Sequence, residues 1–141
     1  METSLVRNRL RETIERAKRR AAERRSHHDE AARAYGAFLE HVATPMMRQI
    51  AGALKADGYA FTVFTPSGSV RLMSDRRAED FVEVVLDLTG DTPRVVGHSS
   101  RLRGRNIVDQ ERPVGNGTPG SITEEELLEF LLKEIEPLVE R

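Results

Sequence analysis

The chain has 141 residues, of which 32% are charged and 5% aromatic, and it contains neither cysteine nor tryptophan. This length matches one small domain with a modest core, and the lack of cysteine excludes disulfide bonds, thiol nucleophiles and cysteine-based zinc sites. No segment approaches the roughly 20 apolar residues of a membrane span, and the first residues lack the apolar run of a signal peptide, so we expect a cytoplasmic protein with no membrane contact.

Charge is distributed unevenly along the chain. The formal net charge is −1, yet Arg and Lys crowd residues 7–25 while Glu dominates residues 124–140. This asymmetry indicates either a polyanionic partner or a contact between the basic and acidic ends within an oligomer.

The N-terminal part reads as a long helix. Residues 3–42 contain no proline and one glycine, and Ala, Arg and Glu, all good helix formers, make up most of the segment. A seven-residue frame places apolar side chains on a single stripe. One helix cannot bury such a stripe alone, so it must pack on its own domain or on another copy, most simply in a homodimer. The predicted oligomerisation residues are Leu10, Ile14, Ala17, Ala21, Ala31, Tyr35 and Phe38.

Polar residues interrupt this stripe near its middle. Arg24 and His28 occupy stripe positions, and Ser26 followed by Asp29 is a helix-capping pattern. The alternative is therefore two shorter helices that meet near residue 26.

A second, shorter helix is expected to begin at Thr44. The hydroxyl of Thr44 can cap free backbone N–H groups, and Pro45 suits the first helical position because its missing donor costs nothing there. The helix should end near Asp57, since Gly58 can adopt the left-handed conformation that closes helices.

Strand signals follow. Alternating or β-rich runs predict an antiparallel meander of four or five strands, over residues 60–65, 70–74, 81–88, 94–100 and 105–110. Val82 and Val84 should face the core, while Glu83 lies on the other face, where pairing with Arg71 or Arg94 is expected.

The last helix has a clear start. Thr123 is the expected cap, Glu126 can reach back to it, and Ile122 can pack against Leu127. A broad apolar face should cover the sheet, made of Leu127, Leu128, Leu131, Leu132, Ile135 and Leu138.

These elements predict an α+β fold. We place a helical, coiled-coil segment at residues 1–43 and an α+β domain at 44–141, in which the C-terminal helix and residues 45–57 cover the apolar face of the sheet.

No arrangement of residues is specific to one chemistry. A Ser/His/Asp site can be drawn from Ser99 or Ser100 with His98 and Asp109, but nothing in the sequence fixes its geometry. Glu residues after the glycines of 115–120 would repel a phosphate. We therefore expect no enzyme, no cofactor and no metal.

A basic cluster suggests a second kind of partner. If residues 101–105 stay extended, Arg101, Arg103 and Arg105 project to one side, and with Arg71, Arg76 and Arg77 they could bind a polyanion. The sequence predicts a self-associating module that oligomerises through its N-terminal helix and presents its α+β domain to a protein partner. The alternative is a nucleic-acid-binding protein that uses the N-terminal and Arg101–Arg105 basic clusters.

Overall fold

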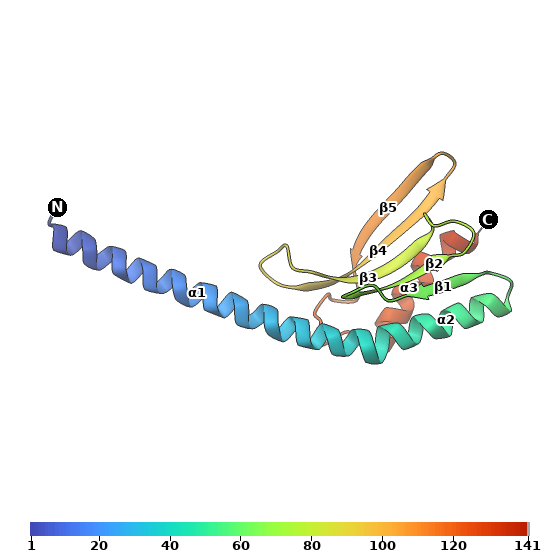
Figure 1. Ribbon diagram of the computed structural model, residues 1–141, viewed down its shortest axis with the longest axis horizontal. Coiled ribbons are helices and arrows are strands. Elements are labelled where there is room, and N and C mark those ends of the chain that lie inside the picture. Colours follow the sequence, from blue (N-terminus) through green and yellow to red (C-terminus); the bar gives the residue numbers. More distant parts are fainter. Residues whose placement is uncertain (141) are drawn as a thin grey trace.

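The computed structural model describes residues 1–140 and has the α+β architecture expected from the sequence (Figure 1). Within these residues, no helix is both long and apolar enough to cross a membrane. In chain order the elements are α1 (Thr3–Phe38), the π-helical turn η1 (Leu39–Ala43), α2 (Thr44–Ala56), β1 (Phe61–Phe64), β2 (Ser69–Ser74), β3 (Phe81–Asp87), β4 (Arg94–Arg103), β5 (Asn106–Pro113) and α3 (Glu124–Val139).

The five strands form one antiparallel sheet in the order β1-β2-β3-β4-β5, which confirms the predicted meander. The last hairpin is longer than predicted. Phe81, the first residue of β3, pairs with Ser100, but β4 and β5 continue to the pair Arg103–Asn106. The tip of the β4–β5 hairpin therefore extends beyond β3 and has no third strand beside it.

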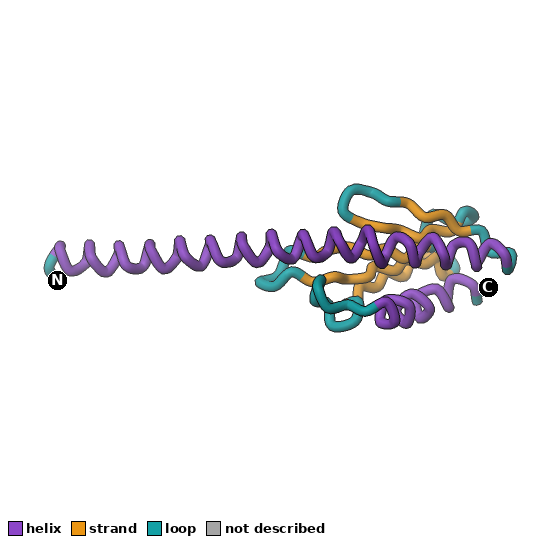
Figure 2. The backbone as a smooth tube through the Cα atoms, turned by 90° about the horizontal axis from the view of Figure 1, so that it is seen from below, coloured by secondary structure: helices purple, strands orange, loops and turns teal. Residues whose placement is uncertain are grey.

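Two helices cover one face of the sheet and leave the other face open (Figures 1 and 2). Helix α2 contacts β1 and β2, whereas α3 contacts β3 and β4. The covered face forms the core, because alternate residues of a strand point to the same side. Its fully buried strand residues are Val70, Leu72, Val82, Val84 and Val95.

The N-terminal helices form one continuous rod (Figure 2). Helix α1 passes through residue 26 without interruption, so the predicted alternative of a break there is wrong. Thr44 is also not a cap: it has helical dihedral angles, and no side chain caps the start of α2. Pro45 cannot donate to the carbonyl four residues earlier, and the π-helical turn absorbs this mismatch without breaking the helix.

Helix α3 begins where the sequence predicts. Thr123 and Glu126 form a complete capping box, and Ile122 and Leu127 are both buried. Its predicted apolar face is too broad, however. Leu128 and Leu132 are 37% and 55% exposed, so the prediction that they cover the sheet is wrong.

Candidate self-association interface

Helix α1 consists of a free part and a part held by the domain (Figure 1). Every side chain in residues 3–20 is exposed. Contact with the domain begins near His27, where α1 lies against the β3–β4 loop and residues 118–120. Residues 3–26 thus project from the domain over about 36 Å, at about 1.5 Å per residue.

One apolar stripe runs through both parts of α1. In the held part, Tyr35 and Phe38 are 5% and 6% exposed and belong to the hydrophobic core. In the free part, Leu10 and Ile14 occupy the same seven-residue frame and are 57% and 45% exposed. Ala17 is exposed, while Ala21 and Ala31 are half-buried. The domain covers the C-terminal portion of the stripe and leaves the N-terminal portion uncovered.

The free part of α1 has little to stabilise it within its own chain. In residues 1–140, no side chain of α1 forms an ion pair, although Glu/Arg pairs three or four residues apart commonly support isolated helices. Its side-chain hydrogen bonds are those of Thr13 with the Arg9 carbonyl and of Arg16 with Thr13. Most helical stability in proteins comes from packing of an apolar face, and residues 3–20 have no such packing within the described residues 1–140.

The predicted basic cluster is split in the structure. Arg71 lies on the open sheet face, where its Nε donates to Glu83 Oε2 at 2.9 Å and its guanidinium lies 4.0 Å from the centre of the Phe81 ring. This confirms the predicted pairing of Glu83 with Arg71. Arg101 lies on the other face, because it is three residues from His98, which pairs across the sheet with Glu83.

Arg103 and Arg105, the other two arginines of the predicted cluster, also lie in different places. Arg103 ends β4, whereas Arg105 lies in the hairpin turn after Gly104, so residues 101–105 do not stay extended. Arg101 and Arg103 instead line one hollow with Arg77. The sequence could not single out Arg77 from the other arginines, since the hollow is lined by residues that are far apart in the chain.

The structure brings together two of the three groups of the imagined Ser/His/Asp site. His98 Nε2 lies 2.9 Å from Asp109 Oδ1, and the imidazole also makes a T-shaped contact with the Phe81 ring. No serine hydroxyl of residues 1–140 is hydrogen-bonded to this imidazole. The His98–Asp109 pair is therefore a cross-strand contact on the open sheet face.

Comparisons of the chain with protein-family models, with curated proteins and with solved structures find no match.

Proposed function

We propose that this chain is a self-associating protein-interaction module in which the free part of α1 docks on a second copy. The observation that carries the proposal is the stripe itself: Tyr35 and Phe38 need the domain to cover them, and Leu10 and Ile14 continue the same stripe without a cover. Complete burial of one such aliphatic side chain contributes about 1.5–3 kcal/mol. A homodimer is the simplest assembly that supplies the cover.

The residues beside the stripe limit which surface of the second copy can cover it. In the seven-residue frame, the flanking positions of the free part carry Arg11, Lys18, Arg20 and Arg25. Two copies of α1 placed side by side would bring these like charges together, which is destabilising. The complementary surface should therefore be apolar with acidic flanks.

Helix α3 offers such a surface on its outer side. Leu128 and Leu132 lie one helical turn apart and are exposed, and the exposed residues Glu125, Glu129 and Glu136 lie beside them. We infer that the free part of α1 packs on α3 of the second copy. In a two-fold dimer this contact would form twice, because each copy supplies one α1 and one α3.

The open face of the sheet is the surface offered to a protein partner. Phe64 is exposed there, and the half-buried Met73 and Phe81 are on the same face. Exposed apolar groups surrounded by polar ones are typical of protein-binding surfaces. The Arg71–Glu83 and His98–Asp109 pairs provide the polar surroundings.

Two variants with the same chemical change test self-association. Leu10→Asp puts a charge on the stripe, whereas Leu5→Asp puts it at an exposed apolar position outside the stripe. We expect light scattering coupled to size exclusion to give a dimer mass for the wild type and Leu5→Asp, and a monomer mass for Leu10→Asp. A monomeric wild type, or equal masses for both variants, would overturn the proposal.

Salt distinguishes the two arrangements of a dimer. Raising the salt from about 50 mM to about 500 mM screens exposed charges. Pairing of α1 with α3 should weaken, because it joins opposite charges. Pairing of α1 with α1 should strengthen, because salt would screen its repulsion, and this result would disprove the α3 surface while leaving self-association intact.

The alternative function, nucleic-acid binding by both basic clusters together, has less support. The N-terminal arginines point in all directions around α1 instead of forming one face, since consecutive residues are about 100° apart. The Arg101–Arg105 hairpin lies at the opposite end of the molecule from the N-terminus (Figure 1).

A further inference from the structure

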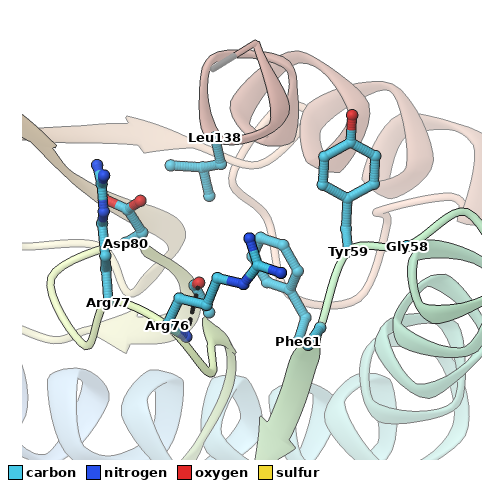
Figure 3. A pocket seen from close by; sticks show the side chains of 9 residues that line it. Gly58, Tyr59, Phe61, Arg76, Arg77, Asp80 and Leu138 are labelled. Carbon is cyan, nitrogen blue, oxygen red and sulfur yellow. Dashed lines mark hydrogen bonds between the residues drawn. The ribbon is translucent and has the colours of Figure 1, made fainter.

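Two adjoining hollows lie at the end of the domain where α3 ends and α2 turns into β1. The larger has a volume of about 540 Å³ and the smaller about 160 Å³. Arg77 lines both of them. The larger is also lined by Arg101, Leu102, Arg103, Gly104, Pro137 and Glu140. The smaller brings in Tyr59, Phe61, Arg76, Asp80 and Leu138 (Figure 3). Two segments distant in sequence, the β2–β3 loop and β4, thus place four arginines around these adjoining hollows.

These arginines keep their hydrogen-bond donors unused. Within residues 1–140, none of the guanidinium groups of Arg76, Arg77, Arg101 and Arg103 forms an ion pair or donates a hydrogen bond to the protein. Each guanidinium has five N–H donors. Arg71, in contrast, is engaged by Glu83 and Phe81.

Asp80 holds the arginine-bearing segments together. Its side chain, in a residue only 4% exposed, accepts the backbone N–H of Leu102 at 2.8 Å. Its backbone accepts from Ser74 N at 2.9 Å and donates to the Arg77 carbonyl at 3.0 Å. These bonds tie the β2–β3 loop to β4, so the backbone of Arg77 is held close to the strand that carries Arg101 and Arg103 before any ligand arrives. Such preorganisation reduces the entropy lost on binding.

The overhanging hairpin directs two of the arginines into the larger hollow. Every second residue of β4 points to the face of the sheet that α3 covers. Arg101 and Arg103 lie on this face, as do Gly97 and Ser99. The hollow consequently lies between the hairpin and the last turn of α3, next to Pro137 and Glu140.

The balance of charge in the larger hollow favours an anion. Three guanidinium groups oppose the Glu140 carboxylate and the partial negative charge at the end of α3. Guanidinium groups match the oxygen geometry of phosphate and bind it in a bidentate manner. The neighbouring hollow adds two aromatic side chains, Tyr59 and Phe61 (Figure 3).

We propose that these joined hollows bind a nucleoside phosphate. Arg77, Arg101 and Arg103 hold the phosphate groups, and the base lies beside Tyr59 and Phe61 in the smaller hollow. Aromatic side chains stack on bases irrespective of base identity. The same chemistry occurs in a free nucleotide and in single-stranded nucleic acid, and the two sources are separable by experiment.

The test is a set of binding titrations with the full-length chain. The probes are ATP, inorganic pyrophosphate and a labelled single-stranded DNA of about 12 nucleotides, each at low and moderate salt. We expect saturable binding of ATP or of the DNA, with pyrophosphate weaker. Arg101→Ala with Arg103→Ala should weaken binding at least about tenfold, since it removes two guanidinium groups that form charged hydrogen bonds with phosphate.

Matched variants make the test specific. Arg33→Ala with Arg48→Ala removes the same charge from exposed positions outside the hollows and should change affinity less than twofold. Glu140→Gln should tighten binding, because it removes the opposing carboxylate. If the double β4 variant does not fold, as judged by circular dichroism, Arg77→Ala in the exposed loop replaces it.

Three results would overturn the proposal. The first is that no probe binds saturably up to about 5 mM, which corresponds to about 3 kcal/mol. The second is an equal loss of affinity in the hollow variants and the control variants. The third is pyrophosphate binding as tight as ATP binding, which would show that the base does not contribute to binding. DNA binding without ATP binding would identify nucleic acid as the source.

Discussion

The hydroxyl group of Tyr35 in α1 donates a hydrogen bond to the carbonyl oxygen of Gly68 in the β1–β2 turn, at 2.7 Å, and lies 3.2 Å from the carbonyl of Val84. The contact joins the held part of α1 to the β1–β2 turn and to strand β3. Burial, and to a lesser extent the charge of Glu83, raise the pKa of the Tyr35 hydroxyl well above its ordinary value.

The raised pKa of Tyr35 predicts a loss of stability in alkali. Above pH about 10 the unfolded chain releases the Tyr35 proton while the folded chain keeps it, so the free energy of unfolding must fall as pH rises. Below that pH the protonated Tyr35 hydroxyl makes its full contribution to the free energy of unfolding. Tyr35→Phe should cost about 1 kcal/mol at neutral pH, because it removes the hydrogen bond. It should also flatten the decline between pH about 10 and 11 in urea titrations. An unchanged alkaline slope would contradict the assignment.

Gly97 is required by its neighbour on α3. A β-carbon at this position of β4 would overlap the ring of Phe130, so Gly97→Ala should destabilise the domain by about 1–3 kcal/mol through overpacking. Thermal or urea denaturation measures the effect. In a Phe130→Leu background the cost should shrink, because the shorter side chain makes room.

Gly36 provides the matched control for this prediction. It lies in α1 with open space around its Cα, so Gly36→Ala should stabilise the helix by about 0.5–1 kcal/mol. Equal costs for Gly97→Ala in both backgrounds would show that Phe130 is not the reason for the glycine.

A buried carboxylate on α3 depends on a residue of β5. Glu134 is buried, and its Oε1 lies 3.4 Å from Arg112 Nη1 without a hydrogen bond from the residues described. Arg112→Met should therefore destabilise by about 1–3 kcal/mol, at the lower end because water screens the partly exposed guanidinium. Adding Glu134→Met should restore most of this loss, since replacing both partners of a buried pair is often neutral.

The control for the ion pair is the neighbouring Lys133, which is exposed. Lys133→Met should change the free energy of unfolding by less than about 0.5 kcal/mol. A double variant that is less stable than Arg112→Met alone would mean that Glu134 has a favourable role beyond this pair.

The start of α3 was predictable because its signals are local. Thr123 and Glu126 lie three residues apart, and their reciprocal hydrogen bonds form within one turn. The exposure of Leu128 was not predictable. Helical spacing marks a broad apolar face, but which part of that face meets the sheet depends on where the strands place the helix.

The spacing of apolar residues in the sequence indicates the π-helical turn, but the capping pattern of Thr44 and Pro45 led to the prediction of a separate helix instead. The buried or half-buried residues Tyr35, Phe38 and Val42 follow one helical frame. Met47, Ile50 and Leu54 continue it one residue out of phase. A turn with one extra residue corrects such a slip without ending the helix.

The candidate sites show the same division between local and distant information. The sequence identified the stripe on α1, because its period is local, but could not tell that the domain covers Tyr35 while Leu10 stays uncovered. Arg77 and Arg101 line the same hollow because the backbone N–H of Leu102 donates a hydrogen bond to Asp80, 22 residues earlier in the chain.

Two truncations test the predicted boundary between the helical segment and the α+β domain. A chain of residues 44–141 follows that boundary and lacks Tyr35 and Phe38, whose side chains are part of the core. A chain of residues 27–141 lacks only the free part of α1. We expect the longer fragment to unfold cooperatively in urea, and the shorter to lose at least about 3–5 kcal/mol, the usual cost of removing one buried aromatic side chain.

The longer fragment is the proper reference in this comparison, because neither fragment contains Leu10 or Ile14, so the uncovered part of the stripe contributes to the stability of neither. Equal urea midpoints would support a domain that begins at residue 44 and would make Tyr35 and Phe38 dispensable. A large difference would place the start of the folding unit within α1, because Tyr35 and Phe38 would then be required for the core. Light scattering on residues 27–141 then gives an independent check, since loss of the free part should leave a folded monomer.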